Sequence, residues 1–368
     1  MIADNPWVDG LARMGIITAA VPLAVIVLTY VERKVLGRLQ MRLGPMRVGP
    51  YGTLQSVADT VKLLTKEDLR PQTADRWTFE LAPFVVVVPV FMALVTLPFT
   101  ADLFVRNLGL GLFYIVAVSG VSIVGFVMAG WGSDNKYALL GGVRAAAQLI
   151  SYEIPLVMAV LAVAMIGQSL NLVELVEGQG RVPFVVWQPL AFLIFLVAGL
   201  AELYRQPFDI PVAESEVVGG PLVEYSGIRW SMFQMAEVAN MVLISVLASL
   251  LFLGGWNWPL GNGAGAGLQV PLIVVKASMF ILLFMWLRGT LPRLRIDQMM
   301  AFCWQVLLPF AFLQIIINGW VLVYGWPDWV LGALSGMAAL AAGYLTYRMA
   351  RQAMEPVSSR LHRVGSVL

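Results

Sequence analysis

The sequence has little charge, one cysteine and one histidine. Charged residues make up 12% of its 368 positions, and the single thiol and imidazole belong to Cys303 and His362. An iron–sulfur cluster needs about four thiolates, a haem normally needs an axial histidine, and a zinc site needs three or four nitrogen or sulfur ligands. The chain alone therefore cannot hold any of these centres or an internal disulfide. Redox centres, if the protein serves redox chemistry, are expected on partner subunits.

Motifs for nucleotide binding and secretion are missing as well. No G-x-G-x-x-G follows an expected strand, and no G-x-x-x-x-G-K-[ST] occurs. The glycines of 261–267 (GNGAGAG) fall between two apolar runs, where they predict a flexible loop. The first apolar run lacks a basic segment before it and a cleavage site after it, so no cleaved signal peptide is expected.

Apolar residues are abundant, at 59% of the chain, and they gather in runs of about 20. A helix of that length crosses the hydrocarbon core of a bilayer. The sequence therefore predicts an all-α, polytopic membrane helix bundle that forms a single integral membrane domain over residues 1–368. Nine transmembrane helices are expected, near 11–31, 79–99, 108–130, 145–167, 184–203, 232–254, 270–288, 299–324 and 329–349.

Lysine and arginine are concentrated on one side of these spans. Twenty of the 24 lie in the tail after residue 347 and in four loops, 32–77, 131–144, 204–231 and 288–298. Because cytoplasmic loops carry an excess of basic residues, these segments are expected in the cytoplasm, with the N-terminus outside. The expected location is a bacterial cytoplasmic (inner) membrane.

The first basic loop contains an amphipathic segment from Leu54 to Lys66. Its apolar positions share one helical face: Leu54, Val57, Ala58, Val61, Leu64 and Thr65. Its polar positions share another: Gln55, Asp59, Lys62 and Lys66. Such a helix lies at the membrane interface or docks a partner. A surface helix that simply covers the bundle explains the pattern equally well.

Several ionisable residues fall inside or at the ends of the expected spans: Glu80, Glu153, Glu202, Glu237 and Lys276. A charged side chain at the bilayer centre costs roughly 2.5–3.5 kcal/mol, so it tends to face a cavity. One interpretation is a static network of ion pairs. The other is a chain of protonatable groups, because burial and neighbouring negative charge both raise a carboxyl pKa.

The stretch from Glu202 to Trp230 concentrates acid beside two spans. Asp209, Glu214 and Glu216 lie within eight residues of one another and repel if all are ionised. Arg205 and Arg229 offset only part of this repulsion. The hypothesis is that these acids titrate as a coupled set that continues into the membrane.

Four blocks of sequence carry a resemblance to a known family: 32–68 (ERKVLGRLQMRLGPMRVGPYGTLQSVADTVKLLTKED), 130–153 (GWGSDNKYALLGGVRAAAQLISYE), 201–230 (AELYRQPFDIPVAESEVVGGPLVEYSGIRW) and 288–298 (RGTLPRLRIDQ). They resemble the H subunit (subunit 1 family) of respiratory NADH:quinone oxidoreductase, complex I. The third block is the most specific.

The resemblance implies a subunit at the junction of the hydrophilic and membrane arms, forming much of the entrance and inner chamber for a lipid quinone (ubiquinone or menaquinone). FMN and iron–sulfur clusters are then expected on partner subunits. This chain itself is expected to have no catalytic residue and to bind neither a metal nor nucleic acid. The implied partners are the iron–sulfur quinone-site subunit, adjacent membrane subunits, the quinone and membrane lipid.

The resemblance also assigns residues. The quinone chamber is expected to involve Arg33, Arg38, Arg42, Arg47, Asp59, Lys62, Arg205, Phe208, Asp209, Tyr225, Arg229, Arg293, Arg295 and Asp297. The proton path is expected to involve Glu153, Glu202, Glu214, Glu216, Glu224 and Glu237.

The chain departs from the family pattern at four positions. Met46 stands where asparagine is common, and Val212 stands where the family's P-E-A-E has its first glutamate. In the third span, Gly120 and Val124 stand where some members have glutamate and tyrosine. The proton route is therefore expected to be shorter or filled by water.

Other interpretations stay open. A related subunit of a membrane-bound hydrogenase, or of a dehydrogenase with another electron donor, shares the blocks. An ion-coupled secondary transporter would use a midplane carboxylate site, but it predicts inverted repeats that the two halves do not show. A purely structural scaffold leaves the intramembrane acids unexplained.

Overall fold

A computed structural model describes residues 6–101, 103–180, 182–258 and 265–354. Within these ranges the regular structure is entirely helical, as predicted. Eight helical segments are long and apolar enough to cross a membrane. They are α1 (Pro6–Leu39), α3 (Arg76–Val95), α4 with α5 (Gly111–Ser119 and Val121–Gly132), α6 (Lys136–Gly167), α11 (Gly227–Phe252), α12 (Ala266–Thr290), α13 to α14 (Ile296–Phe302 and Leu308–Tyr324, joined by a π-helical turn η3, Cys303–Leu307) and α15 (Asp328–Met354).

The expected span at 184–203 is divided into two helices. Gln188 leaves helical geometry, with φ −130° and ψ 57°, between α8 (Phe184–Trp187) and α9 (Pro189–Glu202). Pro189 favours this break because proline disfavours helical geometry in the residue before it. The 14-residue α9 is shorter than a full span. The predicted nine spans are thus eight full spans and one short apolar helix within the described residues.

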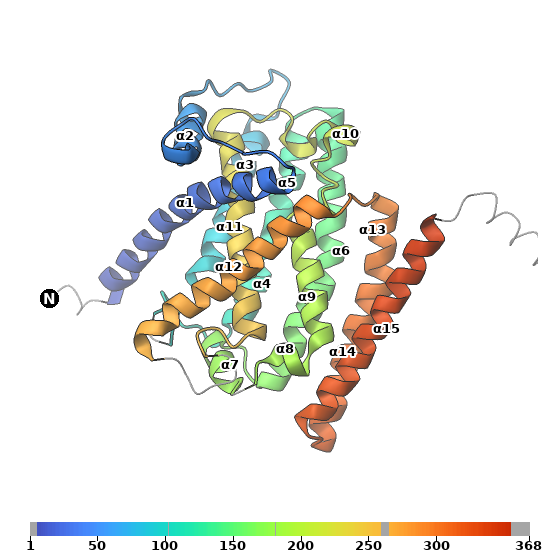
Figure 1. The fold of residues 1–368 in the computed structure, drawn as a ribbon. Helices are drawn as coiled ribbons and strands as arrows, with labels where there is room; N and C mark the ends of the chain where they lie inside the picture. The colour runs from blue at the N-terminus through green and yellow to red at the C-terminus, as the bar shows by residue number, and fades with distance from the viewer. Residues whose placement is uncertain (1–5, 102, 181, 259–264, 355–368) are drawn as a thin grey trace, which may run out of the picture.

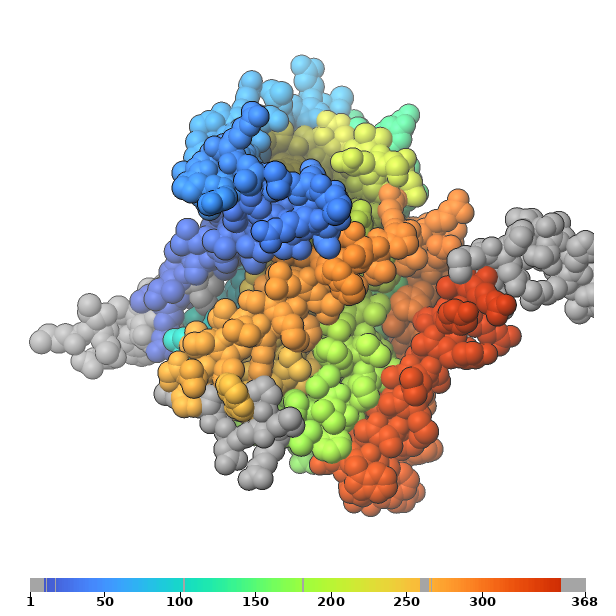
Figure 2. Space-filling view, viewed as in Figure 1, coloured from blue at the N-terminus to red at the C-terminus, as the bar shows by residue number. Residues whose placement is uncertain are grey.

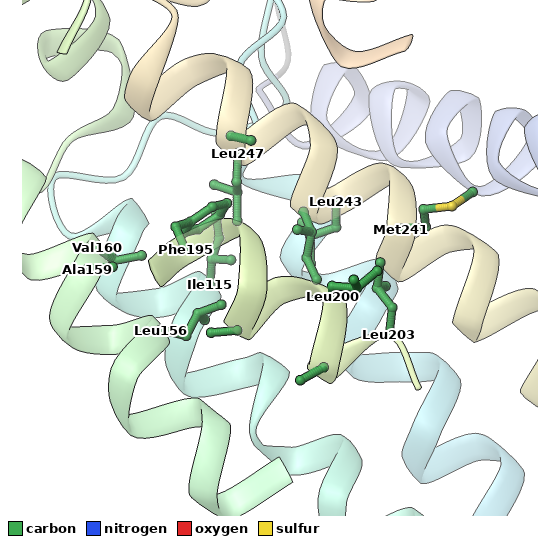
Figure 3. Packing of buried hydrophobic residues seen from close by; sticks show 14 of the residues in the cluster. Ile115, Leu156, Ala159, Val160, Phe195, Leu200, Leu203, Met241, Leu243 and Leu247 are labelled. Atoms are coloured by element: carbon green, nitrogen blue, oxygen red, sulfur yellow. The ribbon is translucent and has the colours of Figure 1, made fainter. Parts of the chain in front are cut away.

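The short helix α9 is tolerated because most of its side chains pack against protein. Figure 3 shows Phe195 and Leu200 of α9 packed among Leu156 and Val160 of α6 and Leu243 of α11. A side chain also compensates for a backbone hydrogen bond lost at the break, since the Ser335 hydroxyl of α15 accepts a hydrogen bond from the Leu190 amide at 3.2 Å. A helix held mostly by protein contacts need not match the thickness of the bilayer, and on α9 Leu193 alone of the large side chains is strongly exposed, at 46%.

Glycines set the close approach of the spans around α5. A Cβ on Gly125 would lie 2.4 Å from Val86 of α3, and one on Gly130 would lie 2.7 Å from the Ala138 carbonyl of α6. Small residues let transmembrane helices approach closely, so that van der Waals contact holds them together. In Figure 1 the two most oblique elements, α1 and α12, cross the face of this packed bundle.

The four basic loops lie at one end of the bundle, uppermost in Figure 1, which we call the basic end. It carries η1 (Pro50–Gly52), α2 (Gln55–Thr65), α10 (Glu214–Val217) and η2 (Gly220–Leu222), whereas α7 (Leu172–Gly178) lies at the opposite end. Figure 2 shows the side chains of the first loop gathered at this end, above α12.

The amphipathic helix is confirmed as α2, and it packs against α1 and α11 with its apolar face turned outward. Ser56 is buried, whereas Val57, Val61 and Leu64 are 43%, 54% and 59% exposed. The helix therefore lies against the bundle, as one of the two interpretations expects, but the apolar face of the predicted pattern does not make that contact. The apolar face points away from the chain, toward lipid or a partner.

Candidate functional site

A cavity of about 1010 Å³ opens at the basic end, beneath the loop that joins α9 to α11. One part of its wall carries ionisable side chains: Glu202, Arg205, Asp209, Glu214, Glu237, Arg288 and Arg293. Another part is aromatic: Phe126, Tyr204, Tyr225, Trp230 and Phe233. We call this space the basic-end cavity. It offers both charged and apolar surfaces to one occupant.

The loop that walls the cavity is fixed to α6 at two places. The buried Gln148 amide donates to the carbonyls of Ala201 and Phe208, at 2.7 and 2.8 Å, and so holds both ends of the turn. Further on, Gly220 has φ +56° and lies against Gly141, where a Cβ would come within 2.4 Å of the Gly220 α-carbon. Only glycine fits this approach without displacing backbone.

Arg205 forms the centre of a buried charge network. Its side chain is 1% exposed; Nη1 donates to Glu32 at 2.7 Å, and Nε lies 3.1 Å from Glu237. Arg288 donates to the same Glu32 oxygen. Because a buried charge is costly unless it is paired, these contacts hold α1, α11 and α12 around the cavity loop.

A second, more exposed network lies beside the cavity, whose wall includes Ser215 and Arg293. Arg144 and Arg293 both contact Glu216, at 2.7 and 3.1 Å, and Arg293 also donates to Ser215. Asp209 has no basic group within 4 Å among the described residues. Burial raises the pKa of Asp209 to about 6, although Arg288 and Arg293 act in the opposite direction. This carboxyl group therefore changes protonation near neutral pH.

Comparisons with known proteins identify the family of the chain. The sequence profile of the NADH dehydrogenase family matches residues 12–319. The chain belongs to this family. It is 47% identical to a Brevibacillus brevis protein named as the H subunit of NADH-quinone oxidoreductase, over 84% of this chain and 93% of that protein. Proteins of the same name from Geobacillus kaustophilus and Dehalococcoides mccartyi are 50% and 42% identical, over 83% and 90% of this chain and 92% of each relative. The resemblance found from the four blocks is thereby confirmed.

The family departures in the third span have a structural consequence here. A Cβ on Gly120 would lie 2.5 Å from Oε1 of Glu153, so the missing side chain makes room for this carboxylate. Glu153, Glu202 and Ser119 line a small recess next to Gly120. Glu202 borders both the recess and the basic-end cavity, and Asn240 lies at a long 3.5 Å from it. The carboxylates at 202 and 153 thus lead from the cavity into the bundle.

Ion pairs form at some of these acids and not at others. Glu237 pairs with Arg205, and Glu80 pairs with Arg70 at 3.1 Å, which supports the static interpretation for these two. Glu153 and Glu202 have no basic partner within 4 Å in the part of the chain that the structure describes. The static interpretation therefore does not describe these two residues, and their interpretation as protonatable groups stays a prediction.

Other family positions lie outside the basic-end cavity. Arg33 and Lys62 pair with Asp59 on α2; burial tends to raise the pKa of Asp59, but Arg33 and Lys62 hold it below its usual value. Seven further positions do not line the cavity either: Arg38, Arg42 and Arg47 (exposed on the first loop), Arg229 (paired with Asp68), Glu224 (bonded to Asn135), and Arg295 with Asp297 (exposed at the start of α13).

Several aromatic and buried groups support the wall from behind. Tyr225 stacks on Phe79 with ring centroids 4.2 Å apart, and the guanidinium of Arg229 lies over the Phe79 ring. Phe208 is buried against Tyr152. The sequence interpretation missed Glu32 and Arg288 as site residues, although both begin blocks that it quoted. Their signal was a charge at the very end of an apolar run.

Among the described residues, no three His, Cys, Asp or Glu side chains are placed to hold a metal ion. Cys303 is buried and donates to the Ser151 carbonyl, while His362 lies outside the described residues.

Proposed function

We propose that this chain is the membrane subunit of a proton-translocating NADH:quinone oxidoreductase that forms much of the quinone chamber. The observation that carries the proposal is the basic-end cavity, whose wall combines aromatic surface with arginines and unpaired carboxyl groups. Its volume, about 1010 Å³, is at the upper end for small-molecule sites. The aromatic wall suits a quinone ring, and the polar wall suits its two oxygens.

Reduction of a quinone to a quinol takes two electrons and two protons. We assign the electrons to an iron–sulfur cluster on a partner subunit, with FMN further away, because this chain has one cysteine. The chain's own contribution is to bind the ring, position it and respond to the change in charge. Asp209, with its pKa of about 6, is the group best suited to give or take a proton at the cavity wall.

The proposed proton route runs from the cavity into the bundle. Glu202 borders the cavity and the recess, and Glu153 borders the recess, so the two join these spaces. The missing family glutamate at Gly120 leaves room for Glu153 to take its place. At Val212, which lines the cavity, no acid is available, so Asp209 and Glu214 are the acids of that loop that face the occupant.

We further propose that the basic end faces the cytoplasm of a bacterial inner membrane and carries the iron–sulfur subunit. The arginines of the first loop support the orientation, because cytoplasmic loops carry an excess of basic residues. The outward apolar face of α2 supports a contact there with protein or lipid, because an exposed apolar patch is commonly covered. A cysteine introduced at exposed Glu214 should react with an impermeant reagent from the cytoplasmic side. Reaction from the opposite side only would contradict the orientation.

The test of function uses the assembled complex in proteoliposomes. Glu202→Gln should lower the number of protons moved per quinone reduced, because it removes a protonatable group and keeps the shape. Glu80→Gln is the matched control, since Glu80 is a salt-bridged carboxylate that does not line the cavity. Equal proton stoichiometry in the Glu202→Gln, Glu80→Gln and unaltered complexes would contradict the proton route.

The chamber itself is tested separately from proton movement. Phe233→Ala should raise the KM for a short-chain quinone, because it removes an aromatic wall, with little change for electron acceptors that react at the partner subunits. A mild-detergent purification identifies the partners. Recovery of this chain without an iron–sulfur subunit or flavin would reject its assignment to this enzyme.

A further inference from the structure

Lys276 lies near the middle of α12, and its side chain is buried, at 8% exposed. Its ammonium donates to the carbonyls of Leu253, Gly255 and Asn257, at 2.7, 2.7 and 2.8 Å. Three acceptors satisfy all three N–H donors. No carboxylate lies within 4 Å of this ammonium in the described part of the chain. Lys276 is therefore not part of the acid networks at the basic end.

The three carbonyls belong to five residues that follow α11. Gly254 and Gly255 have φ of +70° and +49°, so the chain folds back and its carbonyls converge. The fold of this segment is held independently of Lys276: the Gly255 backbone amide donates to the Ser249 carbonyl at 2.8 Å, and the Asn257 side-chain amide donates to the Val176 carbonyl at 3.1 Å. The ring of carbonyls is thus preformed.

Converging carbonyls are the arrangement with which proteins bind monovalent cations in place of water. The position adds a second favourable factor, since the C-terminus of a helix carries partial negative charge and Leu253 is the C-cap of α11. The segment therefore offers a cation both oxygen ligands and a negative electrostatic potential. The cation that occupies it is the ammonium group of Lys276, which belongs to α12.

We propose that Leu253–Asn257 is a monovalent-cation site whose resident ion is the tethered ammonium of Lys276. Because α11 carries the site and α12 carries the cation, their union fixes the register of the two helices. Both helices reach the basic-end cavity, through Glu237 and Arg288. Lys276 is a positioning residue that acts from the far end of the bundle.

The test is chemical rescue in the purified complex. Lys276→Ala removes three carbons and the ammonium group of the side chain, and so leaves a cavity that matches propylammonium in shape. The rate of heat inactivation of quinone reductase activity should rise at least about tenfold. Propylammonium should reverse this rise in a saturable manner in the variant and not alter the unaltered complex. Met279→Ala, a change on the exposed side of α12, is the control and should keep the original rate.

Two comparisons make the result decisive. Tetramethylammonium at equal concentration, which has charge but no N–H donor, should not rescue. Lys276→Met, which keeps length without charge, should inactivate as fast as the alanine variant. If Lys276→Ala prevents assembly, the amount of complex in membranes from cells grown with propylammonium is measured instead. The proposal is overturned if Lys276→Met matches the unaltered complex, or if propylammonium restores neither heat resistance nor assembly.

Discussion

Replacement of Arg205 by methionine tests whether the buried network holds the cavity together. The change removes the guanidinium from between Glu32 and Glu237, which lie 2.7 and 3.1 Å from it. Removing one partner of a buried ion pair costs about 3–5 kcal/mol, because the other charge stays buried. Arg288 still contacts Glu32, and Glu237 is 28% exposed, so we expect the low end, about 3 kcal/mol.

Arg229→Met is the matched comparison. Arg229 is also an arginine of the same loop region, but its side chain is 21% exposed and its partner Asp68 is 26% exposed. A partly exposed pair is worth less than a buried one, about 1 kcal/mol. The assay is the denaturant dependence of unfolding of the purified complex, followed by α-helical circular dichroism and by a label on α12. The difference between the two variants should be about 2 kcal/mol or more.

A double-mutant cycle tests whether Glu32 and Arg205 contribute to stability through their contact with each other. Glu32→Gln alone leaves Arg205 with Glu237, and the double variant Glu32→Gln, Arg205→Met leaves no charge facing a lost partner at position 32. The double variant should therefore be less destabilised than the sum of the two single variants, by about 1 kcal/mol or more. Strict additivity, or equal stability of the Arg205→Met and Arg229→Met complexes, would refute the buried network as the element that holds the loop.

Three further predictions address single positions. Gly120→Ala should change the free energy of unfolding by less than about 1 kcal/mol, because the added methyl group meets a flexible carboxylate. It should nevertheless lower the number of protons moved per quinone reduced, because it displaces Glu153; an unchanged number would contradict this. Gly141→Ala meets backbone and should destabilise by about 1–3 kcal/mol, measured by thermal unfolding; a neutral result would show that the loop moves freely. Asp209 should be protonated below pH 6 and ionised above it, so an infrared carboxyl band should disappear as pH rises through about 6 and be absent in Asp209→Asn.

The same Asp209 has a consequence for stability. Because its pKa is raised from 3.8 to about 6 on folding, the folded chain binds the proton more tightly than the unfolded chain. Stability from this group is therefore greatest at low pH and falls as pH rises from about 4 to about 6. Asp209→Asn should remove that part of the pH dependence and leave the rest.

The spans were predictable because lipid imposes a simple requirement. A helix in contact with hydrocarbon needs about 20 apolar residues, and this length is visible in one sequence. The break at Gln188 was not predicted, because α9 packs against α6 and α11 and is not bound by that requirement. Composition alone cannot distinguish a run that faces lipid from one that faces protein.

The site was predictable only in part, for a similar reason. Local charge density identified the loop from Glu202 to Trp230, and the cavity does lie beneath it. The partners of Arg205 could not be read from the sequence, since Glu32 is 173 positions away. The amphipathic pattern of α2 likewise predicted a helix but not the face that packs, because exposed apolar side chains are compatible with a partner that covers them.

The acids around the cavity separate into two groups by their contacts. Glu32, Glu216 and Glu237 each contact an arginine, and such contacts stabilise the ionised form and fix the backbone. Asp209, Glu202 and Glu153 line the cavity or recess without an ion-pair partner in the described residues. A fixed network, formed by the first group, and protonatable groups, proposed for the second, are therefore compatible in one structure. In the proposed proton route, the arginine-paired acids hold the wall in place, so that the unpaired acids can change protonation without loss of the fold.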